Sequence, residues 1–189
     1  MHGESLFAEF ADLHRNVLAV KLDGTTKEDY VWGLRVGFIS FAWKGATEEQ
    51  LQAMAAKAAG DVRSGISNAS SIGQHLALKA YADPAYAKQK REKYAVLKKR
   101  YRIIRHLLKT HPEWQSRFEP MPFNSGYFMC VKPKGVDVEA VRRKLIEKYS
   151  TGTIVLSGLI RLAFSTTPCE KLPVLFANVA AAVDDVRLA

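Results

Sequence analysis

The chain has 189 residues, of which 48% are hydrophobic and 25% are charged, and it contains two cysteines. This length and apolar content predict one ordinary domain or two small ones, and they exclude a disordered or low-complexity chain. No apolar run reaches the ~18 residues that a membrane helix needs, and the first ten residues lack a secretory leader. Cys130 and Cys169 form neither a CxxC pair nor a cluster with histidines. We therefore expect a cytoplasmic protein without a metal site, a disulfide framework or a membrane partner.

The net charge of +9 comes from one segment. Residues 85–109 hold ten basic residues and one acid, while the rest of the chain is close to neutral. Apolar residues recur there in steps of three and four: Tyr94, Leu97, Tyr101, Ile104 and Leu108. This period predicts a long amphipathic helix whose basic face is solvated. A basic module that binds nucleic acid through this helix is the alternative function, and nucleic acid is not the partner that we favour.

The other predicted elements follow in mixed α/β order, without an internal repeat. In the first half we expect strands over 16–22 and 36–43, a helix that Thr47 opens with a capping box and that ends at Gly60, and a helix over 70–81. In the second half we expect a strand over 126–131, a helix from Asp137 to Tyr149, a hairpin over 153–164 around Ser157-Gly158, and a closing helix over 172–186.

The most informative local feature is the stretch DGTTKEDYVWGLRVG, residues 23–37. Lys27 follows a predicted strand and stands beside the hydroxyls of Thr25 and Thr26, and Arg35 comes eight residues later. A lysine that forms an imine with an aldehyde must present a neutral amine, which a nearby cation favours. Arginine also binds phosphate bidentately, and a threonine hydroxyl can donate to the same phosphate. From these residues alone, a solvated lysine in an acidic turn is the simpler interpretation.

This stretch resembles the Schiff-base lysine signature of class I aminotransferases, the fold-type-I enzymes that depend on pyridoxal phosphate. In that signature a small or hydroxyl residue precedes the lysine, and Arg-aliphatic-Gly follows eight residues on. Thr26, Lys27 and Arg35 fit this pattern. Gly24 stands where many members have a phosphate-binding serine. The resemblance therefore implies that Lys27 carries the cofactor and that Arg35, with Thr25 or Thr26, holds its phosphate.

A second motif begins at Arg63. Residues 63–68, RSGISN, followed by Gly73, resemble the Arg-x-x-x-Ser-Asn loop with which the neighbouring subunit of aspartate-type aminotransferases reaches across the dimer. The resemblance implies a homodimer in which Arg63 and Asn68 contact the substrate. From the residues alone, Arg63 is expected in a turn after Gly60.

Two further motifs follow in the order of the family. Residues 124–128, NSGYF, resemble the Gly-x-Phe entry to a strand of the small domain. Residues 160–164, IRLAF, resemble the strand whose arginine, here Arg161, holds the α-carboxylate of the amino acid. A guanidinium in an apolar strand needs a carboxylate partner in any case, and Glu119 or Asp137 is the alternative to a substrate.

Together these motifs imply an α/β chain that is the end of a fold-type-I large domain over residues 1–95, followed by the small α+β C-terminal domain over residues 96–189. The family also uses residues upstream of the lysine strand, among them an aspartate that pairs with the pyridine nitrogen, and residues 1–16 leave no room for them. We therefore expect the C-terminal portion of an aminotransferase, which moves an amino group between an amino acid, of aspartate or glutamate type, and a 2-keto acid. The isolated chain is expected to be inactive, and a catalytically dead aminotransferase-like domain is a further alternative.

Overall fold

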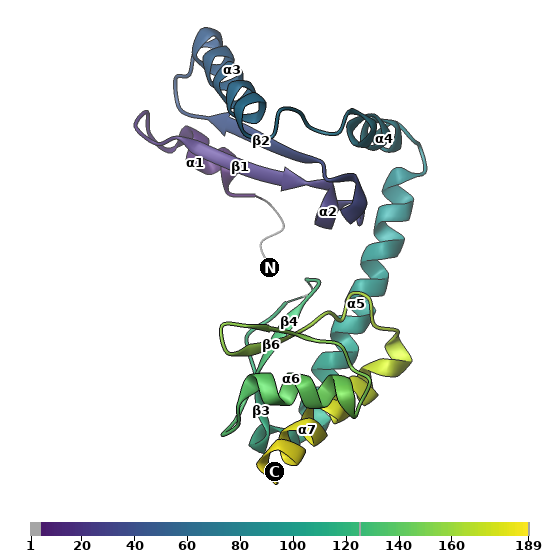
Figure 1. The fold of residues 1–189 in the computed structure, drawn as a ribbon. Helices are drawn as coiled ribbons and strands as arrows, with labels where there is room; N and C mark the ends of the chain where they lie inside the picture. Colours follow the sequence, from purple (N-terminus) through teal and green to yellow (C-terminus); the bar gives the residue numbers. More distant parts are fainter. Residues whose placement is uncertain (1–4, 125, 189) are drawn as a thin grey trace. The chain divides into compact units, whose positions relative to one another are not determined.

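The structure is a computed structural model that describes residues 5–124 and 126–188 (Figure 1). The chain divides into two compact units, Met1–Lys90 and Arg91–Ala189. The division falls five residues before the predicted boundary at residue 95, inside the continuous helix α5 (Tyr86–Thr110). Among the described residues, no helix combines the length and the apolar character that crossing a membrane requires.

The first unit is built on a two-stranded antiparallel sheet. Its strands are β1 (Ala19–Gly24) and β2 (Gly37–Ala42), which confirms the two strands that the sequence predicts. Its helices are α1 (Phe7–Leu13), α2 (Thr25–Glu28), α3 (Glu48–Gly65), α4 (Ser71–Tyr81) and the start of α5, with a 3-10 turn, η1 (Trp32–Leu34). The sequence did not predict α1, α2 or η1, because elements this short show no helical period.

Helix α3 begins where the sequence predicts and ends later. Thr47 and Gln50 form the capping box, since each side chain accepts a hydrogen bond from the other residue's backbone N–H, at 3.3 and 3.1 Å. The predicted end at Gly60 is wrong: the helix continues to Gly65, so Arg63 lies in its last turn. One glycine costs a helix only about 1 kcal/mol, which is too little to end it.

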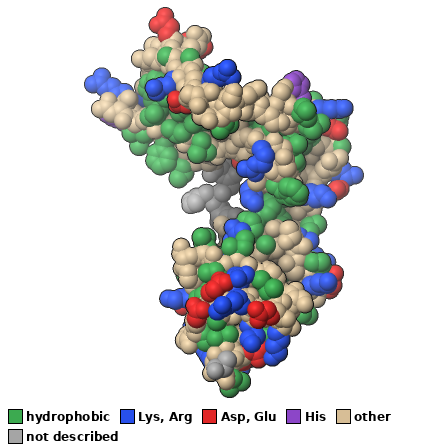
Figure 2. Space-filling model, in the orientation of Figure 1, with side chains coloured by type: hydrophobic (Ala, Val, Ile, Leu, Met, Phe, Trp, Pro, Cys, Tyr) green, Lys and Arg blue, Asp and Glu red, His purple; other side chains and the backbone are tan. Residues whose placement is uncertain are grey.

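One face of the β1–β2 hairpin is apolar and exposed. The register sets Val20 and Leu22 opposite Phe41 and Ile39, and alternate residues of paired strands share a face. Leu22 is 75% exposed. Figure 2 shows hydrophobic side chains gathered over this part of the first unit. Apolar sheet faces are normally covered by a second layer of structure.

The second unit packs helices against a four-stranded antiparallel sheet of order β3-β4-β6-β5. Its strands are β3 (Phe118–Pro120), β4 (Met129–Pro133), β5 (Ile154–Leu156) and β6 (Leu159–Leu162). Its helices are the rest of α5, α6 (Val138–Glu147) and α7 (Leu172–Arg187), with 3-10 turns η2 (Pro112–Ser116) and η3 (Cys169–Lys171). The described strands of both units pair only antiparallel.

The core of the second unit confirms several predicted features. Of the predicted apolar face of α5, Ile104 is buried in it and Tyr101 and Leu108 pack against it, whereas Tyr94 is 43% exposed and lies outside it. Asp137 caps α6 by accepting the Ala140 N–H at 2.9 Å. The β5–β6 turn has positive φ at both Ser157 and Gly158, as a two-residue hairpin turn requires.

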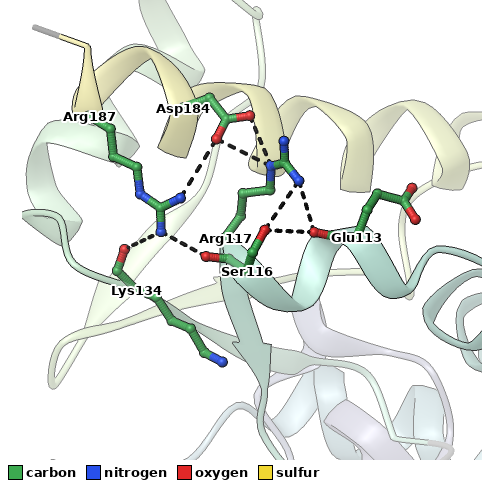
Figure 3. Close-up of polar contacts among 6 residues, drawn as sticks. All are labelled: Glu113, Ser116, Arg117, Lys134, Asp184 and Arg187. Atoms are coloured by element: carbon green, nitrogen blue, oxygen red, sulfur yellow. Dashed lines mark hydrogen bonds and ion pairs between the residues drawn. The ribbon is translucent and has the colours of Figure 1, made fainter.

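A polar network ties the end of α7 to η2 and to the end of β4 (Figure 3). Arg117 donates from Nε to both carboxylate oxygens of Asp184, at 2.9 and 3.2 Å. Arg187 donates from Nη2 to the carbonyls of Ser116 and Lys134, each at 2.8 Å. These bonds hold the C-terminal helix against the first strand pair of the second unit.

Candidate active site

Residues 25–36 form a loop whose two ends are bonded to each other. The N–H and the Oγ1 of Thr25 donate to the Val36 carbonyl at 3.2 and 3.3 Å, which extends the β1–β2 ladder by one residue on each strand. The Thr25 carbonyl accepts the N–H groups of Asp29 and Val31, each at 3.1 Å. Thr25 is 1% exposed. It therefore closes the loop and also fixes its first turn.

This placement gives Thr25 a structural role in place of the predicted phosphate contact. Its hydroxyl hydrogen is used on a backbone carbonyl, and its side chain is buried. Thr26 is half-buried and Lys27 is exposed, both within α2. Thr26 follows Thr25 and Arg35 precedes Val36, so their backbones leave the ladder side by side. The loop thus carries a hydroxyl, an amine and a guanidinium.

Two residues of this loop adopt left-handed backbone conformations, Tyr30 with φ 61° and Arg35 with φ 54°. For residues other than glycine such conformations cost of order 1–3 kcal/mol, and they persist only where the surroundings enforce them. The exposed Arg35 also donates from Nη1 to the Trp32 carbonyl at 3.3 Å. The geometry of the arginine is therefore imposed by its loop.

Helix α4 helps to hold the loop backbone in this conformation. A Cβ added at Gly73 would lie 2.6 Å from the Leu34 carbonyl oxygen and 3.1 Å from a methyl of Val36. The helix and the loop thus touch without a side chain between them, as only glycine allows. The contact fixes the backbone on both sides of Arg35.

Asp29, two residues after Lys27, joins the loop to two helices. Its carboxylate accepts the Tyr81 hydroxyl of α4 at 2.8 Å, the Tyr86 hydroxyl of α5, and the Lys90 Nζ of α5 at 3.1 Å. Lys90 also donates to the Tyr86 hydroxyl at 3.1 Å. The Asp29 side chain is 10% exposed. No sequence pattern predicts this cluster, because an aspartate after a glutamate is typical of a solvated turn.

The contacts lower the pKa of Asp29 and raise the pKa values of Tyr81, Tyr86 and Lys90. Burial raises the pKa of Asp29, but hydrogen bonds from Tyr86, Tyr81 and Lys90 outweigh it and lower that pKa below 3.8. Burial and the bond to Asp29 raise the pKa of Tyr81 to about 12 and also raise that of Tyr86. Burial lowers the pKa of Lys90, but its bonds to Tyr86 and Asp29 raise it overall. At neutral pH the cluster is a carboxylate, an ammonium and two neutral phenols.

Arg63 and Asn68, the predicted substrate contacts of the first unit, lie at the end of α3 and in the loop after it. Arg63 donates from Nη1 to the Ser67 Oγ at 2.8 Å, and Ser67 has φ 69°. The Asn68 N–H donates to the Ile66 carbonyl at 2.8 Å. Both predicted residues are exposed. Arg63 and Asn68 are close to each other in the sequence, and they are distant in the sequence from the Lys27 loop.

Arg161 belongs to the second unit, on β6 opposite Cys130 of β4. Its guanidinium carbon lies 4.5 Å from the centre of the Phe128 ring, within the range of a cation–π contact. Glu119 and Asp137 are the predicted alternative partners of Arg161. Among the described residues neither of them forms an ion pair with Arg161, and Asp137 instead caps α6. The half-buried guanidinium of Arg161 can donate hydrogen bonds to the carboxylate of a ligand.

An open hollow of about 660 Å³ lies against Phe128, the ring that Arg161 covers. Its lining is mainly apolar: Met121, Pro122, Phe123, Asn124, Phe128, Met129, Cys130 and Leu159. Asn124, from the predicted strand-entry motif, accepts the Gly126 N–H at 3.2 Å, while Ser125 of that motif lies outside the described residues. The strand itself begins at Met129, three residues later than predicted.

Solved structures with the same arrangement of elements identify the fold. The chain matches an aminotransferase from Anaerococcus prevotii with a TM-score of 0.71 and 23% identity, over 90% of this chain and 40% of that one. This chain has part of the aminotransferase fold. It also matches an α-aminoadipate aminotransferase from Thermus thermophilus (TM-score 0.67, 17% identity, 89% and 42% covered) and an aromatic aminotransferase from Pyrococcus horikoshii (0.64, 16%, 90% and 44%).

These matches confirm the predicted fold, that of the C-terminal portion of a fold-type-I chain. The chain spans about 40% of the length of the structures that it matches. No protein-family model matches it, and no curated protein does. A fold supports many reactions, so the chemistry has to be inferred from the site residues.

Proposed function

We propose that the protein containing this chain is a pyridoxal-phosphate-dependent aminotransferase, which transfers an amino group between an amino acid and a 2-keto acid. The observation that supports this most strongly is the closed loop from Thr25 to Val36. It carries an exposed lysine, a hydroxyl and an arginine on a chain with the aminotransferase fold. Neither alternative, a nucleic-acid-binding module or a dead enzyme, has comparable support.

The side chains of this loop fit the cofactor. Arg35 and the Thr26 hydroxyl are suitable donors for its phosphate, and the exposed amine of Lys27 is suitable for its aldehyde. Thr25 is left out of this set, because its hydroxyl donates to Val36. When bound, pyridoxal phosphate supplies an aldehyde and an electron-withdrawing ring.

The remaining roles follow from the side chains themselves. Lys27 would hold the cofactor through its amine, and the same amine would move a proton at the substrate Cα. Arg161 binds the α-carboxylate through two parallel hydrogen bonds, and its stacking on Phe128 limits the orientations of the guanidinium.

Borohydride reduction tests this function directly. The full-length protein is incubated with pyridoxal phosphate, reduced, digested and mapped by mass spectrometry. The adduct is expected on Lys27, and Lys27→Arg abolishes it, whereas the control Lys21→Arg on β1 leaves it in place. An adduct on another lysine, or none with the cofactor present, rejects the proposal.

We propose aspartate or glutamate as the amino donor, with Arg63 and Asn68 binding its distal group. The bond to Ser67 uses one of the five N–H groups of Arg63, and the others remain for a carboxylate. Loss of a charged partner costs about 2–5 kcal/mol, so Arg63→Ala should lower kcat/KM for aspartate by at least about tenfold. Alanine as donor and the control Lys57→Ala on the same helix should show little change. Equal losses for aspartate and alanine contradict this donor class.

A homodimer is part of the proposal, because the family reaches the substrate with Arg63 across a subunit interface. Helix α4 and the loop before it expose large apolar side chains, which supports such an interface: Ile66 70%, Ile72 76%, Leu76 50% and Leu78 67%. Light scattering after gel filtration should give twice the chain mass for the full-length protein, and Ile72→Glu should give the monomer. A monomeric wild type rejects the dimer.

A further inference from the structure

We propose that Asp29 is a positioning residue for Lys27, acting through Tyr81, Tyr86 and Lys90. The inference rests on the proposed function, because it concerns the lysine that holds the cofactor. It adds a residue that acts through the backbone of α2 without touching the cofactor itself.

The shape of α2 explains why Lys27 needs such support. The helix has four residues, and no side chain caps its N-terminus. A single turn is not stable by itself, because helix nucleation is unfavourable. Its position therefore depends on what its two ends are bonded to.

The two ends have different anchors. Thr25 is bonded to Val36 at the start of the turn. At the other end, the Asp29 N–H donates to the Thr25 carbonyl, and the Asp29 carboxylate bonds to side chains of α4 and α5. Lys27 lies midway, two residues from each anchor. Release of either end lets the lysine turn move while the β1–β2 ladder stays formed.

The chemistry of the second anchor makes it strong. The carboxylate accepts hydrogen bonds from one ammonium and two phenols, and the rings of Tyr81 and Tyr86 pack edge to face with centroids 5.4 Å apart. All four residues belong to the first unit. Asparagine at position 29 keeps the shape of the aspartate side chain but removes its charge. Its NH2 group is itself a hydrogen-bond donor, so the donors of the cluster that face it lose their acceptor.

The chain contains a matched control for this cluster. In the second unit the Asp185 carboxylate accepts Lys148 Nζ at 2.7 Å and the Tyr149 hydroxyl at 2.8 Å. Asp185→Asn thus breaks the same kind of contact far along the sequence from Lys27. Asp29→Asn is the main variant, and Tyr81→Phe is a milder one that removes a single bond if the main variant folds poorly.

The experiment uses the full-length protein and two measurements. Hydrogen exchange follows the backbone amides of residues 25–31. Labelling with pyridoxal phosphate and borohydride, over a range of pH, compares Lys27 with Lys21 in the same chain. Asp29→Asn should speed exchange over 25–31 by about tenfold and lower the preference for Lys27 severalfold, with a shift in the pH midpoint of Lys27 labelling alone. Tyr81→Phe should act in the same direction, and Asp185→Asn should have neither effect.

Each other outcome overturns the inference. Unchanged exchange over 25–31 shows that Asp29 does not hold the turn. Faster exchange with unchanged labelling of Lys27 shows that the cluster stabilises the unit without positioning the lysine, and the proposed function then still stands. Wild-type protein that labels Lys27 no better than Lys21 rejects the proposed function, and the positioning role fails with it.

Discussion

Gly73 of α4 and Leu34 of the Lys27 loop meet backbone to backbone, with 2.6 Å between an ideal Cβ on Gly73 and the Leu34 carbonyl oxygen. Real Cβ atoms essentially never come within 3.0 Å of a heavy atom that is not bonded to them or close by along the chain. The obstacle is backbone and cannot rotate away as a flexible side chain does. The place of Arg35, the next residue after Leu34, therefore depends on the absence of a side chain at position 73.

Gly73→Ala should consequently displace the loop or α4. We expect a loss of about 1–3 kcal/mol in the stability of the first unit, as is typical of overpacking. Pyridoxal phosphate should also bind more weakly, because Arg35 moves. Urea unfolding and cofactor titration measure the two effects.

Gly60→Ala is the matched control, since Gly60 lies within α3 and its added Cβ meets nothing within 4 Å. Alanine there should stabilise the helix by up to about 1 kcal/mol. If Gly73→Ala is as harmless as this control, the close approach of α4 does not constrain the loop.

The Asp29 cluster predicts how the stability of the first unit depends on pH. The folded state lowers the pKa of Asp29, so its contribution is complete above about 3.8 and is lost as the pH falls through the lowered value. The folded state raises the pKa of Tyr81 from 10.0 to about 12, so that contribution is lost as the pH rises through this range. Tyr86 and Lys90 shift upward too and add to the alkaline loss.

Asp29→Asn should therefore cost about 1–3 kcal/mol at neutral pH, and the difference from wild type should shrink below pH 3.8. Urea unfolding from pH 3 to pH 11 measures it, with Trp32 and Trp43 as fluorescent reporters in the first unit. A difference that stays constant down to pH 3 contradicts the ionised carboxylate.

Arg187 should stabilise the second unit through the carbonyls of Ser116 and Lys134 (Figure 3). Arg187→Gln removes two charge-assisted bonds and should cost about 1–3 kcal/mol in the thermal unfolding of this unit. Arg143→Gln on α6 is the control, because Arg143 is exposed and should change stability by less than about 0.5 kcal/mol. Equal effects of the two substitutions would show that only net charge matters.

The basic face of α5 should bind duplex DNA weakly and without sequence preference. Lys98 and Arg102 are exposed, as a solvated face requires. Fluorescence anisotropy should show binding at low salt that disappears at physiological salt, because affinity from phosphate contacts falls steeply as salt rises. Tight binding that persists there, and that Lys98→Glu with Arg102→Glu abolishes, would favour the nucleic-acid alternative.

The sequence by itself determined the features that depend on neighbouring residues. Periodicity predicted α5, capping residues placed the starts of α3 and α6, and a two-residue turn placed the β5–β6 hairpin. The resemblance of the Lys27 motif and of three motifs after it to the aminotransferase family predicted the fold. Local signals misplaced the end of α3, since one glycine costs a helix only about 1 kcal/mol and does not by itself end it.

Only the tertiary structure decided which side chains serve which purpose. Thr25 and Thr26 are indistinguishable in the sequence, yet Thr25 is buried and bonded to Val36 whereas Thr26 is half-buried. Asp29 meets Tyr81 and Lys90 across more than fifty residues of chain, and no local pattern encodes such a contact. The physical reason is that burial and hydrogen-bond partners depend on the elements brought against a loop, whereas spacing and propensity depend on the chain alone.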